Sequence, residues 1–140
     1  MIKFEKLPAD IVQRLPGLSD VLSRDENVIF AYLFGGLARG EVKPLSDVDI
    51  ALYVKQPVDI AECKLRLYQT ITDALGTDEL DLVMLNTAPV SLTGRIVQNR
   101  QVIVDKAPFL RHAYESLTLR EFFDFKIKED RFFKERYGIG

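Results

Sequence analysis

The chain has 140 residues, of which 47% are hydrophobic and 29% are charged, and its net charge at pH 7 is −2. We expect a single domain over residues 1–140, and the nearly neutral charge argues against direct nucleic-acid binding, which usually needs a basic face. Cys63 is the only cysteine, which excludes an internal disulfide, and no apolar run approaches the ~18 residues of a membrane span, so we expect a soluble cytoplasmic protein.

Two kinds of apolar pattern alternate along the chain. Dense runs of Val, Ile, Leu and aromatic residues predict strands at 27–34, 48–54, 79–85 and 101–104, the last at a sheet edge. Apolar residues at helical spacing predict helices at 8–24, 36–40, 57–76, 89–99 and 108–137. Pro16 predicts either a kink or a division of the first helix, and Gly76 is a plausible helix stop. The pattern predicts an α/β fold with a small mixed sheet of about three to five strands.

Asp47 and Asp49 lie at the start of the second predicted strand. Side chains two positions apart on a strand project from the same face, so the two carboxylates would point together while Val48 and Ile50 face the core. Neighbouring carboxylates repel one another unless a positive group lies between them. Mg²⁺ suits such a pair, because it is bound in proteins by one or two carboxylates together with waters and substrate phosphates.

Gly35-Gly36 ends the first predicted strand. Glycines at this point leave backbone N–H groups open to an approaching anion. Arg39 follows one helical turn later and could meet a phosphate, although it could also be an ordinary surface residue. We assign a nucleotide contact to Ser46 as well, with a simple role at the strand entry as the alternative.

Asp81 is the third acid of interest, because it lies in the middle of an apolar strand where a charge is costly unless it is paired or metal-bound. If this strand lies beside the strand of Asp47 and Asp49, the three carboxylates converge. Glu79 lies on the same face, nearer the start of the strand, and is the second choice.

Gly35-Gly36, ten further residues and Asp47-Val48-Asp49 together resemble the signature of the polymerase-β-type nucleotidyltransferases. The sequences around them, Leu-Phe-Gly-Gly-Leu-Ala-Arg-Gly and Ser-Asp-Val-Asp-Ile-Ala, are similar to those of the minimal nucleotidyltransferases, many of which are antitoxins of HEPN-domain RNase toxins. Those small members usually have Ser where this chain has Gly36.

The resemblance implies a nucleotidyltransferase fold with helices packed mainly on one side of the sheet. It also implies transfer of a nucleoside monophosphate, AMP from ATP, to a hydroxyl, with a tyrosine of a HEPN toxin as the acceptor. Asp47, Asp49 and Asp81 would be the catalytic and metal-binding acids, with Asp81 as general base, and Gly35, Gly36 and Arg39 would position the phosphates. Two alternatives remain open: an enzyme with a small-molecule acceptor such as an aminoglycoside, and a binding module that silences its partner by contact alone.

The segment from Pro108 to Tyr137 is predicted to be a long helix rich in aromatic residues. It carries eight of the fourteen aromatics in the chain, interleaved with charges of both signs. Such a helix either packs on its own sheet or forms an interface with a second copy or another protein. Arg95, on the preceding helix, fits equally a nucleotide site and a structural salt bridge, and the single histidine, His112, is given no role.

Overall fold

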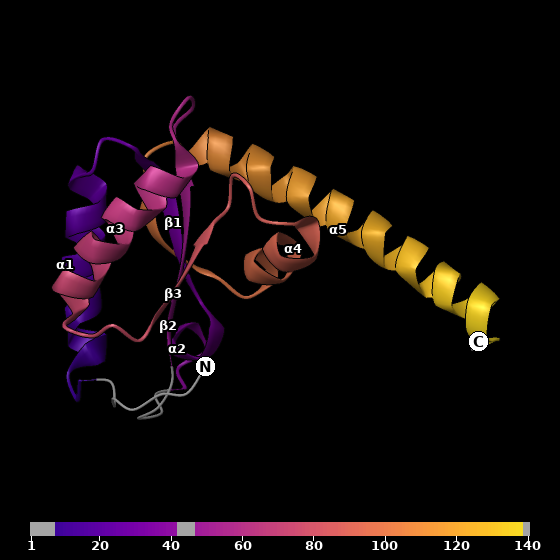
Figure 1. The fold of residues 1–140 in the computed structure, drawn as a ribbon, viewed down its shortest axis with the longest axis horizontal. Coiled ribbons are helices and arrows are strands. Elements are labelled where there is room, and N and C mark those ends of the chain that lie inside the picture. Colours follow the sequence, from indigo (N-terminus) through magenta and orange to yellow (C-terminus); the bar gives the residue numbers. More distant parts are fainter. Residues whose placement is uncertain (1–7, 42–46, 139–140) are drawn as a thin grey trace.

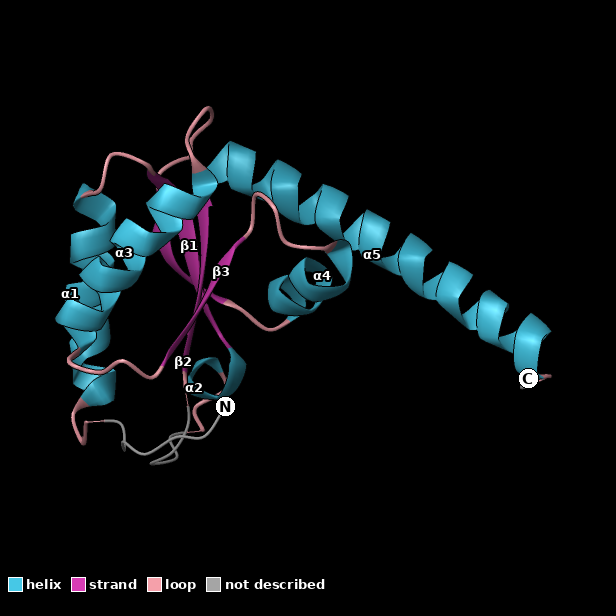
Figure 2. Ribbon diagram, in the orientation of Figure 1, coloured by secondary structure: helices cyan, strands magenta, loops and turns pink. Residues whose placement is uncertain are grey.

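A computed structural model describes residues 8–41 and 47–138, and these contain one mixed sheet with the strand order β3-β2-β1-β4 (Figures 1 and 2). The strands are β1 (Val28–Phe34), β2 (Val48–Val54), β3 (Leu80–Met84) and β4 (Gln101–Asp105). β1 pairs antiparallel with β2 and β4, and β2 pairs parallel with β3. The predicted α/β class and the edge position of the last strand are confirmed.

The described helices are α1 (Ile11–Arg24), α2 (Gly35–Ala38), α3 (Ile60–Leu75), α4 (Val90–Gln98) and α5 (Pro108–Tyr137). Their order is the predicted one, and the boundaries differ from the prediction by at most three residues. α1 contains Pro16 and is not divided there. Gly76 ends α3 in the left-handed conformation, as predicted. In the part of the chain that the structure describes, no helix is both long and apolar enough to cross a membrane.

The sheet has an apolar core on each face. The larger core lies on a single face, as expected for a fold whose helices pack mainly on one side. α1 and α3 lie side by side over this face and bury apolar residues of all four strands beneath them (Figure 1). The opposite face carries a smaller core built around Phe30 and Tyr32 of β1, covered by α4 and the start of α5. Both faces of the central strands are therefore buried, which explains their nearly continuous apolar sequences.

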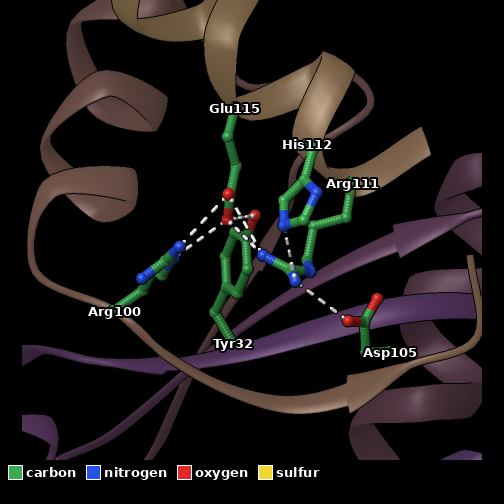
Figure 3. Close-up of polar contacts among 6 residues, drawn as sticks. All are labelled: Tyr32, Arg100, Asp105, Arg111, His112 and Glu115. Carbon is green, nitrogen blue, oxygen red and sulfur yellow. Dashed lines mark hydrogen bonds and ion pairs between the residues drawn. The ribbon is translucent and has the colours of Figure 1, made fainter. Parts of the chain in front are cut away.

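A buried ion-pair cluster fastens the start of α5 to the sheet (Figure 3). The carboxylate of Glu115 accepts hydrogen bonds from Tyr32 Oη at 2.7 Å and Arg100 Nε at 2.9 Å. Arg111 donates to both Glu115 oxygens, and its other terminal nitrogen donates to Asp105 Oδ2 at 2.9 Å. Burial and the hydrogen bond to Glu115 raise the pKa of Tyr32, so its hydroxyl stays a donor. The cluster joins β1, the two ends of β4 and α5.

Gly94 of α4 lets α5 approach closely. A Cβ added at Gly94 would lie 2.5 Å from Phe122 Cβ and would overlap the ring. Phe122 is the last buried residue of α5, and beyond it the helix leaves the body of the protein with its aromatic side chains exposed (Figure 1). A homo-oligomer formed through this part of α5 stays a prediction.

Gly94→Ala is expected to lower the free energy of unfolding by about 1–3 kcal/mol, the usual cost of forcing extra carbon into a packed contact. Phe122→Ala removes the ring that the new methyl group would strike. In a double-mutant cycle followed by urea denaturation, the cost of Gly94→Ala should fall to less than half in the Phe122→Ala background. Equal costs in the two backgrounds would contradict this account of the helix contact.

Candidate active site

The strand pairing brings Asp49 and Asp81 next to one another. β2 and β3 are parallel and in register at these two residues, so the adjacency of strands on which the convergence of the acids depended is present. Register partners on neighbouring strands project from the same face of the sheet. Asp49 is half-buried and Asp81 is exposed. Two carboxylates therefore stand side by side at the open end of the parallel pair.

Asp47 lies directly before β2 and is half-buried. The N–H of Val48 donates to the carbonyl of Glu79 at 2.9 Å, which places the backbone of Asp47 beside that of Glu79. Val48 and Ile50, between and beyond the acids, are fully buried in the larger core, as predicted. The alternation along β2 thus separates a core side from a side that carries acids.

Gly35 makes room for the carboxylate of Asp49. Phe34 is the register partner of Asp49 on β1, and Gly35 follows it with φ +70°, a conformation that favours glycine. A Cβ added at Gly35 would lie 2.8 Å from Asp49 Cγ and would overlap Oδ2. Gly36 has no such restriction, because the nearest atom to an added Cβ is 3.5 Å away. The serine usual at this position in similar small proteins would fit here.

Gly35→Ala is expected to abolish the activity of the site, because the new methyl group displaces the Asp49 carboxylate and the residue disfavours a positive φ. Gly40 offers a matched control, since it has φ +79° but open space around an added Cβ. Both alanine variants should lose about 1–2 kcal/mol of stability from backbone strain. Only Gly35→Ala should lose activity, and equal loss in both would contradict the steric argument.

Arg39 and Arg95 line one pocket beside Gly35. The pocket has a volume of about 290 Å³, and its wall consists of Phe34, Gly35, Arg39, Leu92, Arg95, Ile96 and Asn99. Arg39 Nη2 lies 3.3 Å from Glu41 Oε2 in an exposed pair. Arg95 forms no ion pair with any described residue, so the structural salt bridge that was its alternative role is not found there. Two guanidinium groups near the acids suit an anionic ligand.

Ser46, the remaining predicted nucleotide contact, lies outside the described residues. A second pocket, of about 510 Å³, has Asp81 in its wall and shares Leu92 with the first. Asp49 pairs with Phe34 of the first pocket on one side and with Asp81 of the second pocket on the other.

The residues present fit a hard divalent cation. Carboxylates are the donor type that Mg²⁺ prefers, and the space left by the missing side chain of Gly35 is filled by an Asp49 oxygen. Among residues 8–41 and 47–138, no three His, Cys, Asp or Glu side chains are close enough to hold a metal ion by themselves. Mg²⁺ does not need three, because it usually retains waters and shares substrate phosphates. Asp47 and Asp49 would hold it together with a bound triphosphate.

A family model described as "Polymerase beta, Nucleotidyltransferase" matches residues 17–109. The chain belongs to this nucleotidyltransferase family. The matched segment includes all four strands and both pockets, whereas almost all of α5 lies beyond it. The roles of the acid pair and the glycine turn in nucleotidyl transfer stay predictions. A comparison with curated protein sequences gives no significant match.

Chains of known toxin–antitoxin structures share the fold of this nucleotidyltransferase. A chain of a toxin–antitoxin complex with AMP-PNP is 21% identical, with a TM-score of 0.72, covering 86% of this chain and 96% of that one. A chain of the MntA–HepT complex is 19% identical, with a TM-score of 0.67, covering 89% and 97%. A third, from a complex of tri-AMPylated Shewanella oneidensis HEPN toxin with MNT antitoxin, is 20% identical, with a TM-score of 0.67, covering 88% and 96%. At these identities the likeness establishes the fold alone.

Proposed function

We propose that this nucleotidyltransferase transfers AMP from ATP to a tyrosine hydroxyl of a HEPN-type toxin, and so acts as the antitoxin of that toxin. The observation that carries the proposal is the register of Asp49 and Asp81 on adjacent parallel strands, beside a glycine whose missing side chain leaves space for the first carboxylate. That arrangement offers one acid to the nucleotide and one to an acceptor. The similar folds found in complexes with AMP-PNP and with an AMPylated HEPN toxin support the choice of nucleotide and partner.

In the proposed reaction the acceptor oxygen attacks the α-phosphorus of ATP. The new bond joins the acceptor oxygen to the α-phosphorus, and the bond from that phosphorus to the bridging oxygen breaks, releasing pyrophosphate. Asp81, which is exposed and next to Asp49, takes the proton of the acceptor hydroxyl as general base. The attacking and leaving oxygens lie roughly in line in such a transfer, so the acceptor enters on the Asp81 side.

The other residues position the triphosphate. Arg39 and Arg95 face the pocket beside Gly35 and balance the charge of the phosphates. Asp47 and Asp49 would hold Mg²⁺, which would supply positive charge to balance the charge of the phosphates during transfer. In this proposal Arg39 gives up its exposed ion pair with Glu41 when it binds the phosphates.

Label transfer from ATP carrying a radioactive α-phosphate tests the proposal. The purified protein is incubated with Mg²⁺ and lysate of the native host, beside the Asp47→Asn/Asp49→Asn double variant. We expect one labelled protein band that is absent with the double variant, and the label should map to a tyrosine of a HEPN-domain protein. Labelled pyrophosphate is followed in parallel with ATP that carries its label on the γ-phosphate.

Release of pyrophosphate without a labelled protein would contradict the proposal and favour transfer to a small-molecule acceptor. If neither labelled protein nor released pyrophosphate is detected, the remaining alternative is a module that silences its partner by contact alone. That alternative makes its own prediction, since the Asp47→Asn/Asp49→Asn variant should then still neutralise the toxin in cells.

A further inference from the structure

The second pocket runs along an open edge of the sheet. β3 is the outer strand at one side, and no described strand pairs with it other than β2. α3 flanks the groove on one face of the sheet and the start of α4 on the other. The residues that line it are Ile60, Ala61, Lys64, Asp81, Leu82, Val83, Met84, Thr87, Ala88 and Leu92. We call these ten residues the edge groove.

The backbone of β3 presents hydrogen-bonding groups to the edge groove. The carbonyl of Glu79 accepts from Val48 and the N–H of Leu85 donates to Leu52, so the odd-numbered residues of β3 direct their backbone groups toward β2. Because these directions alternate along a strand, Leu80, Leu82 and Met84 direct theirs to the open side. The N–H of Leu80 donates to the carbonyl of Asp78, and the carbonyl of Met84 accepts from Thr87 and Ala88, which leaves the middle of the strand around Leu82 for an added chain.

We propose that the acceptor enters as an extended polypeptide segment that adds a strand to the open edge of β3 and places its hydroxyl at Asp81. This inference rests on the proposed nucleotidyl transfer and names the substrate class and its binding mode. Addition of a strand supplies affinity through main-chain hydrogen bonds, and pockets for alternate side chains supply specificity. A small molecule has no matching row of backbone groups.

The chemistry of the edge groove describes the segment that fits it. Apart from Asp81 and Lys64, its wall is apolar or carries a single hydroxyl, so it suits apolar side chains. Lys64 is exposed and forms no ion pair with any residue that the structure describes. An acidic side chain on the segment would meet Lys64, while the hydroxyl lies at Asp81 near the start of β3. Charge complementarity therefore favours a segment with one hydroxyl residue and an acidic neighbour.

The edge groove also continues from the candidate active site. Asp81 belongs to both, and Leu92 lines both the edge groove and the pocket of Arg39 and Arg95. A strand on β3 would thus run past the acids on the side opposite the nucleotide pocket. This is the geometry that an in-line attack on the α-phosphorus needs.

Binding of synthetic peptides to the full chain tests the inference without ATP. The probe is a fluorescent seven-residue peptide of Val and Thr with one central tyrosine and one glutamate, followed by anisotropy. Two further peptides carry N-methyl groups on alternate amides. One peptide is methylated at the odd-numbered residues and the other at the even-numbered residues, and we call these the two phases. We expect one phase to weaken binding at least tenfold and the other less than threefold, because only one row of amides can face β3.

Protein variants locate the peptide. Ala61→Trp fills the wall of the edge groove and Lys64→Glu reverses its charge, and each should weaken binding at least fivefold. Lys128→Glu makes the same charge change on α5, away from the groove, and should leave binding unchanged. Thermal melts of all variants exclude a folding defect.

Three results would overturn the inference. The first is equal binding of both N-methylated peptides, and the second is unchanged binding to Ala61→Trp. The third is a dimer in sedimentation that Ala61→Trp dissociates, which would assign the groove to a second copy. Label transfer distinguishes failure of this inference from failure of the proposed function. If Ala61→Trp and Lys64→Glu label the host acceptor normally, the role of the edge groove is rejected and the proposed function stands. If the unchanged protein labels nothing, the proposed nucleotidyl transfer itself is rejected.

Discussion

Asp49→Asn is expected to lower the rate of nucleotidyl transfer by roughly 1000-fold or more. The substitution keeps the size of the side chain but removes the negative charge that would hold Mg²⁺ against the phosphates, an interaction worth several kcal/mol in the transition state. The measurement is pyrophosphate release under saturating ATP and Mg²⁺, with the unfolding temperature recorded beside it.

Asp81→Asn gives a different result if Asp81 is the general base. The rate should fall by about 10²–10⁴-fold, while ATP binding, measured by calorimetry, should stay within about twofold. Asp20→Asn on the exposed face of α1 removes the same charge far from the site and should leave both quantities unchanged. If Asp81→Asn weakened ATP binding as much as Asp49→Asn, Asp81 would belong to the nucleotide site and not to the acceptor.

Glu115→Ala is expected to lower the free energy of unfolding by about 3 kcal/mol, because it leaves Arg100 and Arg111 without their shared carboxylate in a largely buried place. The unfolding temperature should fall by about 10 °C. Glu121→Ala, on an exposed turn of the same helix, should cost less than about 0.5 kcal/mol. Similar losses in the two variants would mean that the cluster does not fasten α5.

The same cluster predicts an acid-dependent loss of stability. Burial alone would raise the pKa of Glu115, but hydrogen bonds from Arg100 and Tyr32 outweigh it and hold the pKa below its usual value near 4.5. A lowered carboxyl pKa stabilises the folded state above the unfolded-state pKa, and this contribution is lost as the pH falls through the folded-state value. The stability difference between the wild type and Glu115→Gln should therefore be constant near neutral pH and shrink below about pH 4.5.

Much of the candidate site could be predicted because its residues are close in sequence or follow simple periodicity. Asp47 and Asp49 share a face through strand alternation, and a carboxylate in the apolar run around Asp81 needed a reason to be there. The pairing of Asp49 with Asp81 was stated only as a condition, because the order of the strands depends on contacts between segments that are distant in the sequence. Gly35 was expected to expose backbone to an anion, whereas the structure adds that it leaves space for Asp49.

The features that were missed depend on contacts between distant segments. The glutamate at the centre of the buried cluster is 83 positions from its tyrosine partner, and neither residue lies in a motif. Arg95 could not be assigned because only the folded chain brings it to Gly35 and Arg39. The edge groove was missed for the same reason, because only the folded chain shows that β3 lies at an edge of the sheet.

The long helix α5 has unequal halves. Glu115, Thr118 and Phe122 bury its first half, whereas no later residue of the helix is buried. Isolated helices shorter than ~12–15 residues are marginal in water, so the uncovered end opens at little cost and is the natural first target of a protease. A protein that covers this end would shield it from cleavage. The lifetime of each copy in the cell would then depend on whether such a covering protein is present, and uncovered copies would be the first to be degraded.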